Sequence, residues 1–207
     1  IVLELQKRND VQIELVTFSD KNAYQTDYPT IHPIVIPSWI KSSIFKPWTY
    51  HIQELQSFVD SFTPDVIHTH LFEAEFVSRC VRYPKAKWFS HCHDNMKQFR
   101  SFDSKTLCNK NLLTNWYEKH RLLANYKRNG GTTFVAISAD TLKFFEQNGG
   151  DNSVEFLANA IQCGNFASAK IGRVSSNTLR LINIASFQVK KNQQFIVEVA
   201  KELKNRD

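Results

Sequence analysis

Residues 65–70, with the sequence DVIHTH, follow Pro64 and form a short run that contains the apolar pair Val66 and Ile67 and ends in histidine. A run of this length, bounded by a proline, is typical of a buried β-strand. A second run, KWFSH at residues 87–91, has the same character and also ends in histidine. The two runs indicate neighbouring strands of a buried sheet.

Strands alternate with helices along the rest of the chain. The predicted strands are residues 11–18, 34–36, 65–70, 87–91, 133–137, 154–157 and 179–185. Helical spacing of apolar residues predicts helices at 50–62, 76–81, 112–124, after Ser138 and at 195–203. The polar stretch 94–110 predicts a mobile loop. Because several strands are apolar throughout, we expect an α/β fold, a Rossmann-like parallel sheet with helices on both faces.

Residues 165–178 are small, polar and poor in aromatics, so they are the predicted linker. We expect residues 1–164 to form an N-terminal Rossmann-like domain that lacks its first strand. Residues 179–207 would begin a second, incomplete Rossmann-like domain. Met96 is the only methionine, and the chain opens on what resembles the end of a helix. We therefore expect the sequence to be a fragment of a longer protein.

Charge and composition exclude several classes of protein. The 26 basic and 20 acidic residues leave a net charge of +6, which suits an anionic ligand or membrane surface but is too diffuse to indicate nucleic-acid binding. No apolar run approaches the roughly 20 residues of a membrane span, and no secretory signal is visible. The four cysteines form no C-x-x-C pair, which favours a reducing compartment. We expect a cytoplasmic protein.

Basic residues bracket one predicted helix end and the strand after it. These residues are Arg79, Arg82, Lys85 and Lys87. They form either an ordinary solvated face or a peripheral contact with anionic lipid at the inner membrane face.

Histidines gather at the ends of two predicted strands. Residues two apart on a strand face the same side, so His68 and His70 form one pair, and His91 and His93 form another. The carboxyl ends of parallel strands form the edge where α/β sheets bind ligands. Three interpretations stay open: a zinc site, acid–base catalysis by His91, and a polar rim that caps backbone groups.

Other polar residues follow the same strand ends. Asp94 and Asn95 come directly after the second histidine pair and can bind a polyhydroxylated ligand or orient an imidazole ring. Alternatively, they form an Asx turn. Ser138 ends a later strand and can cap the next helix, and Asn159 lies near the end of the strand after it.

Lys191 lies between the last predicted strand and the last predicted helix. A helix N-terminus offers free backbone N–H groups and a positive dipole end, so a lysine there favours phosphate binding. The alternative is a solvated lysine in a turn. Neither G-x-G-x-x-G nor G-x-x-x-x-G-K-[ST] occurs, so a dinucleotide or P-loop site lacks its motif.

Five segments, in chain order, resemble those of family 4 glycosyltransferases, most closely the members that make bacterial capsule and exopolysaccharide. They are residues 64–70 (PDVIHTH), 89–95 (FSHCHDN), 134–138 (FVAIS), 154–161 (VEFLANAI) and 191–193 (KNQ). The resemblance implies a GT-B fold, in which two Rossmann-like domains face a cleft. It also implies sugar transfer from a nucleotide-diphosphate donor to a glycan or lipid-linked acceptor, with retention of configuration and without a catalytic metal or other cofactor.

The resemblance further implies roles for single residues. His91 would lie by the transferred sugar, and Lys191 would bind the donor diphosphate. The residues implied in sugar or acceptor binding are His70, His93, Asp94, Asn95, Ser138 and Asn159. Ser186 stands where the family usually has an arginine, so one diphosphate contact is missing or supplied elsewhere. We expect the intact protein to be a hexosyltransferase and this chain alone to be inactive.

Two other functions stay open. One is a zinc-dependent hydrolase that uses the two histidine pairs, and the other is a carbohydrate-binding remnant without catalysis.

Overall fold

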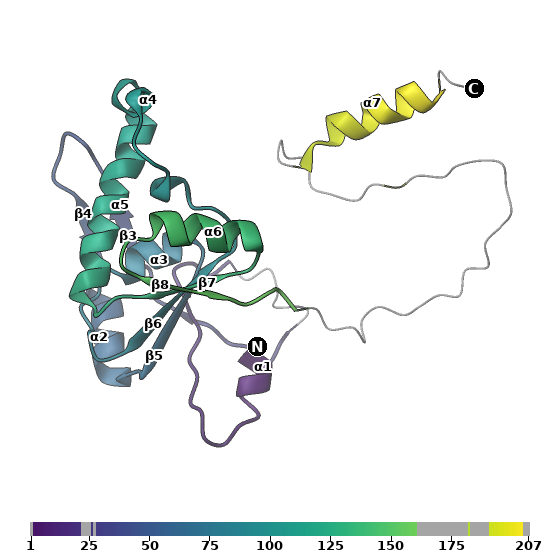
Figure 1. Ribbon diagram of the computed structural model, residues 1–207. Coiled ribbons are helices and arrows are strands. Elements are labelled where there is room, and N and C mark those ends of the chain that lie inside the picture. The colour runs from purple at the N-terminus through teal and green to yellow at the C-terminus, as the bar shows by residue number, and fades with distance from the viewer. Residues whose placement is uncertain (1, 22–25, 27, 161–181, 183–190, 205–207) are drawn as a thin grey trace, which may run out of the picture. The chain divides into compact units, whose positions relative to one another are not determined.

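The structure is a computed structural model that describes residues 2–21, 26, 28–160, 182 and 191–204 (Figure 1). The chain divides into two units, residues 1–161 and 162–207. The predicted linker lies outside the described residues, as do Ser186 and all but one residue of the predicted strand 179–185. The second unit is described chiefly by one helix, α7 (Gln193–Lys204), which agrees with the last predicted helix.

A four-stranded parallel sheet forms the centre of the first unit. Its strands, in spatial order, are β5 (Val66–His70), β6 (Lys87–Cys92), β7 (Thr133–Ala136) and β8 (Ser153–Phe156). Each agrees with a predicted strand to within one or two residues, which confirms the predicted α/β fold with a parallel sheet. Because all four run in the same direction, their carboxyl ends lie along one edge.

Four helices flank this sheet: α2 (Gln53–Phe62), α3 (Phe72–Ser78), α5 (Lys110–Arg128) and α6 (Ala139–Asn148) (Figure 1). Their buried side chains pack against the sheet face that carries Trp88 and Phe134. The sequence predicts helices on both faces, whereas these four lie on one. The strand order advances by one neighbour at each step, so right-handed crossovers place α3, α5 and α6, which connect these strands, on the same side.

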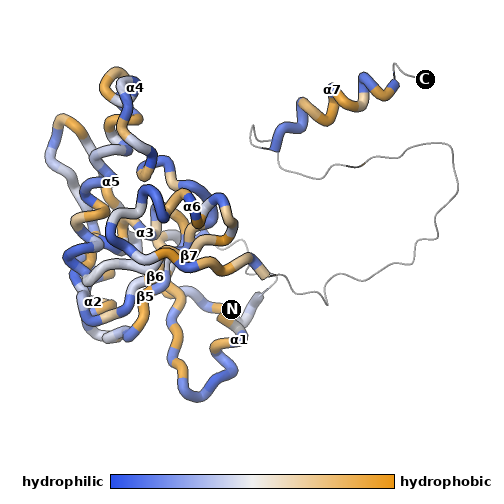
Figure 2. Tube along the Cα trace, in the orientation of Figure 1, coloured by the Kyte–Doolittle hydropathy of each residue, from blue (hydrophilic) through white to orange (hydrophobic). Residues whose placement is uncertain are grey.

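Two hydrophobic cores fill the space between the helices and the sheet. In the first, Leu55 and Val59 of α2 meet Trp88 of β6. In the second, the ring of Phe134 stacks on Phe145 of α6 at a centroid distance of 4.5 Å. The alternation of hydrophobic and hydrophilic residues along α5 and α7 is visible in Figure 2, and such alternation lets a helix bury one side only.

A buried ion pair lies within this packing. Arg79 is fully buried, and its Nε donates to Oε1 of Glu75 at 2.8 Å, one helical turn earlier. The sequence interpretation of Arg79 as part of an exposed basic face is therefore wrong. Its partners Gly131 and Thr132 lie far along the chain and could not be inferred from local spacing.

The N-terminal part of the chain forms short elements. Helix α1 (Val2–Leu5) comes first, β1 (Val16–Thr17) pairs in parallel with β2 (Ile34–Val35), and β3 (Trp39–Lys41) pairs antiparallel with β4 (Thr49–His51). The predicted strands 11–18 and 34–36 are therefore present but shorter. The β3–β4 pair was not predicted, because three-residue strands are too short to show a periodicity.

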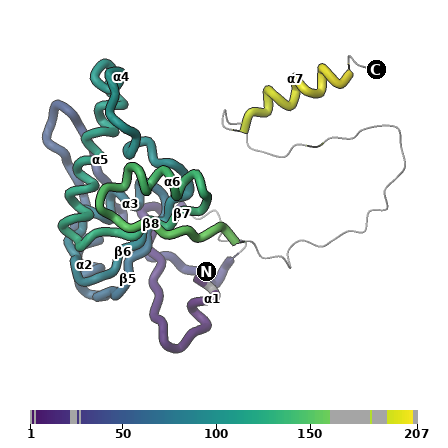
Figure 3. The backbone as a smooth tube through the Cα atoms, in the orientation of Figure 1, coloured from purple at the N-terminus to yellow at the C-terminus, as the bar shows by residue number. Residues whose placement is uncertain are grey.

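The segment between β6 and α5 is more ordered than a mobile loop. It contains a 3₁₀ turn, η1 (Lys97–Phe99), and a short helix, α4 (Ser104–Cys108), which lies at the outer end of α5 (Figure 3). Phe99 is fully buried in the second core, and Asp103 accepts hydrogen bonds from both Thr106 N and Thr106 Oγ1 at 2.9 Å. The prediction of a mobile loop over 94–110 is therefore wrong.

Candidate functional site

Four histidines meet at the carboxyl ends of β5 and β6. His70 is paired in register with His91, so their side chains project to the same side of the sheet. His68 precedes His70 by two residues, and His93 follows His91 by two, so all four belong to the face opposite the helices. Neighbouring ring centroids lie 4.5–5.5 Å apart. These four residues, here called the histidine cluster, come together as strand alternation predicts.

Two close contacts join the rings in pairs. Nδ1 of His91 lies 3.2 Å from Nε2 of His68, and Nδ1 of His70 lies 3.2 Å from Nε2 of His93. A neutral imidazole carries one N–H and one lone pair, so each contact is a hydrogen bond when one ring donates and the other accepts. Each pair therefore requires at least one unprotonated nitrogen.

The rings differ in burial. His91 is only 6% exposed, because β6 is a central strand and the other imidazoles lie around it, whereas His68, His70 and His93 are exposed. Nε2 of His91 is buried and has no hydrogen-bond partner among the described residues. A buried polar atom of this kind is costly unless something else satisfies it.

The cluster favours neutral rings. Although His70 is exposed as a residue, the groups packed around its ring desolvate it, and this effect, followed by repulsion from the neighbouring imidazoles, lowers the pKa of His70 from 6.5 to about 4. Burial is also the largest cause that lowers the pKa of His91 and of His68, where the Glu75 carboxylate opposes it. A neutral imidazole can accept a hydrogen bond, donate one or bind a metal ion.

Asn95 lies beside the cluster in sequence and is fixed by a distant partner. Its Nδ2 donates to Oδ2 of Asp140, in the first turn of α6, at 2.7 Å. Its Oδ1 is buried and has no hydrogen-bond partner among the described residues. The amide is therefore held in place with one acceptor oxygen unused.

The remaining predicted site residues are spread over both units. Ser138 caps α6, where its Oγ accepts from Thr141 N at 3.1 Å. Asp94 follows His93 and is exposed, and Asn159 lies three residues after β8 and is also exposed. Lys191 belongs to the second unit, where it is exposed and lies two residues before α7. The structure thus gives Ser138 a structural role and leaves the other side chains accessible.

Sequence reasoning missed the polar support behind the cluster. Glu75 of α3 accepts hydrogen bonds from Thr69 of β5 and from Ser90 of β6, the latter at 2.7 Å. Because Thr69 and Ser90 alternate with the histidines, this carboxylate fixes both strands from the opposite face. The signal that could have revealed it is the i, i+4 spacing of Glu75 and Arg79 on a short apolar helix.

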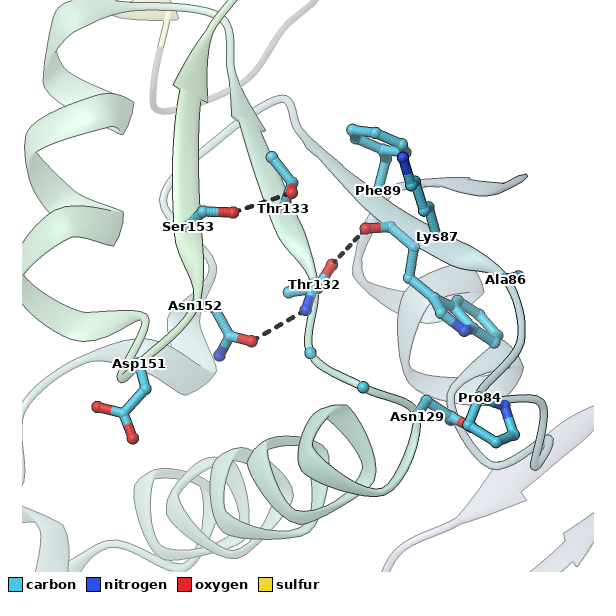
Figure 4. A pocket seen from close by; sticks show the side chains of 13 residues that line it. Pro84, Ala86, Lys87, Phe89, Asn129, Thr132, Thr133, Asp151, Asn152 and Ser153 are labelled. Atoms are coloured by element: carbon cyan, nitrogen blue, oxygen red, sulfur yellow. Dashed lines mark hydrogen bonds between the residues drawn. The ribbon is translucent and has the colours of Figure 1, made fainter. Parts of the chain in front are cut away.

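A cavity of about 380 Å³ lies at the opposite, amino-terminal edge of the sheet (Figure 4). Thr132 N donates to Oδ1 of Asn152 at 3.0 Å, and Oγ1 of Thr133 lies 2.9 Å from Oγ of Ser153. These polar groups bind one another and tie the starts of β7 and β8 together.

No family model, curated protein or solved structure matches this chain. Among the described residues, no helix is both long enough and apolar enough to cross a membrane.

Proposed function

We propose that this chain is part of a retaining glycosyltransferase, which moves a sugar from a nucleotide-diphosphate donor to a glycan or lipid-linked acceptor during surface polysaccharide synthesis. The observation that carries the proposal is the gathering of His70, His91 and His93 at the carboxyl edge of a parallel sheet. This edge is where sheets of this kind bind their ligands. The ordered resemblance to family 4 supplies the reaction class, and the proposed architecture is GT-B.

His91 is the residue proposed to act at the transferred sugar. Its Nε2 is buried and has no partner among the residues that the structure describes, and its ring is fixed through Nδ1 by His68. If Nδ1 donates to His68, Nε2 accepts a proton from a sugar hydroxyl. If Nδ1 accepts, Nε2–H donates to a sugar or leaving-group oxygen. A preorganised group of this kind, aimed at developing charge, contributes to the rate.

The proposed sugar contacts next to His91 come from Asn95, Asp94, His70 and His93. Asn95 is the best supported of these, because Asp140 holds its amide while Oδ1 has no hydrogen-bond partner in the described part of the chain. Asn159 is accessible for an acceptor, whereas Ser138 would have to serve the ligand and the α6 cap together.

Lys191 is proposed to bind the donor diphosphate. It is exposed next to the N-terminus of α7, a helix of 12 residues whose first backbone N–H groups favour an anion. The proposed reaction needs a cation here, because negative charge builds on the leaving diphosphate.

Peripheral contact with an anionic membrane remains a prediction. It is supported by three exposed basic residues, Arg82, Lys85 and Lys87.

The test is His91→Ala in the intact protein, with nucleoside diphosphate release measured over a panel of donor sugars and acceptors. Loss of one preorganised group at the reacting centre is expected to lower kcat by about 100-fold or more. His32→Ala is the matched control, because His32 is exposed and far from the cluster in sequence.

Two outcomes would contradict the proposal. Unchanged turnover in the His91 variant would show that His91 has no role at the transferred sugar. Absence of both transfer and donor hydrolysis in the wild type would favour a carbohydrate-binding remnant without catalysis.

A further inference from the structure

Three ligand nitrogens of the histidine cluster lie close enough together to share one ion. One nitrogen each from His68, His70 and His91 falls within 4.8 Å of the others. A tetrahedral zinc ion, with bonds of 2.0–2.1 Å, holds its ligand nitrogens about 3.3–3.4 Å apart. The 3.2 Å between Nε2 of His68 and Nδ1 of His91 already has this spacing.

The three nitrogens must move only slightly closer together to reach tetrahedral spacing, and rotation of exposed side chains can achieve this. No separation among the three nitrogens exceeds the tetrahedral value by more than about 1.4 Å. His68 and His70 are exposed at the edge strand β5, so rotation of their side chains disturbs no core packing. The backbone need not move, because Glu75 fixes Thr69 and Ser90 from the helix side of the sheet.

A second observation points to a ligand independently. His91 is more than nine-tenths buried, yet its Nε2 has no hydrogen-bond partner among the described residues. An ion bound at Nε2 would satisfy this atom directly, whereas an ion bound at Nδ1, beside Nε2 of His68, would leave Nε2 protonated as a hydrogen-bond donor.

The donor set selects the kind of ion. Neutral imidazoles suit zinc, cobalt, nickel and copper, whereas magnesium and calcium prefer oxygen ligands. Three protein nitrogens leave a fourth position of a tetrahedral ion open to solvent on the exposed side. Nδ1 of His70 lies 3.2 Å from Nε2 of His93, so a hydrogen bond from Nδ1–H to His93 can fix the ring and leave Nε2 of His70 for the ion.

From this geometry we infer that His68, His70 and His91 bind one divalent transition metal ion of the zinc class, with His93 orienting His70. The inference goes beyond the proposed transferase, because the family resemblance implies no catalytic metal. A zinc-binding site is also the first requirement of the alternative function, a zinc-dependent hydrolase.

The test is calorimetric titration of the untagged, EDTA-stripped chain with Zn²⁺, together with the visible absorption of bound Co²⁺, which reports tetrahedral coordination. We expect one Zn²⁺ per chain and no uptake of Mg²⁺. His68→Gln and His70→Gln are each expected to weaken binding at least 100-fold. His93→Gln is expected to weaken it by roughly 10- to 100-fold, the effect of losing an outer partner.

His32→Gln and His120→Gln are the controls, because neither residue belongs to the cluster, and both variants should bind Zn²⁺ as the wild type does. Circular dichroism verifies that each variant is folded, which is expected since His68 and His70 are exposed. The inference fails if the folded wild type binds no Zn²⁺, or if both ligand variants bind it with unchanged affinity. The measurement is metal uptake, so a chain that binds no Zn²⁺ would leave the transferase proposal standing. A wild-type protein without transferase activity would likewise leave the metal inference standing.

Discussion

Arg79 lies fully buried between the rings of Trp88 and Tyr126, 4.2 and 4.6 Å from their centroids. Each of its three side-chain nitrogens has an acceptor: Nε donates to Glu75, Nη1 to Gly131 O, and Nη2 to Ser90 and Thr132. A buried charge is tolerated only when it is paired and fully hydrogen-bonded. Arg79 thus joins α3 to β6 and to the start of β7.

Arg79→Met is expected to reduce the free energy of unfolding by about 3–5 kcal/mol, because it leaves the Glu75 carboxylate buried without its partner. Urea unfolding followed by circular dichroism measures the change. Glu75→Leu combined with Arg79→Met should cost less than the two single changes together, because no lone charge remains buried.

The control is Asp10→Asn, which breaks an ion pair of similar length, Arg8 to Asp10 at 2.6 Å, whose side chains are 58% and 66% exposed. No measurable change is expected there, because water screens an exposed pair. Equal effects at the two pairs would contradict the role of burial.

At the scale of elements, the end of α6 shows how a glycine can be required by space rather than by backbone conformation. Gly149 caps the helix with φ −76°, a value that any residue adopts, and its N–H donates to Phe145 O at 2.7 Å. A Cβ added there would lie 2.7 Å from the same oxygen and 2.9 Å from the ring of Phe134. The helix therefore reaches the sheet at a point with no room for a methyl group.

Gly149→Ala is expected to destabilise the protein by about 1–3 kcal/mol, the usual cost of overpacking a core, although alanine is the better helix former. Thermal unfolding compared with Gln147→Ala, an exposed position on the same helix, separates packing from helix propensity. A Gly149 variant as stable as the wild type would mean that the Phe134 ring moves aside freely.

Sequence patterns predicted the elements that carry strong periodicity and missed those stabilised by single contacts. The strands β5 to β8 were found because apolar runs of this kind need a buried sheet. The helix α4 was missed, although Asp103 and Thr106 form a capping box, because a five-residue helix shows no periodicity. The histidine cluster followed from strand alternation, whereas the free Oδ1 of Asn95 depends on Asp140, which lies 45 residues away.

For the whole molecule, the feature that matters most for stability is that the first unit contains its own hydrophobic cores. The buried residues of both described cores lie between Ile36 and Phe145, within residues 1–161. By contrast, α7 has 12 residues, none of them buried. An isolated helix of this length is marginal in water because nucleation is costly, and within the described part of the chain no side chain of α7 is buried to offset that cost.

We therefore expect residues 1–161, expressed alone, to unfold cooperatively with a Tm within about 2 °C of the 207-residue chain, because the described core contacts are all retained. A peptide of residues 162–207 is expected to show little helical circular dichroism in buffer. Both are measured by thermal scans at equal molar concentration, with repeat scans to establish reversibility. A 1–161 chain that aggregates or melts without a transition would place part of the stabilising core outside the first unit, and the histidine cluster could then be tested only in the longer chain.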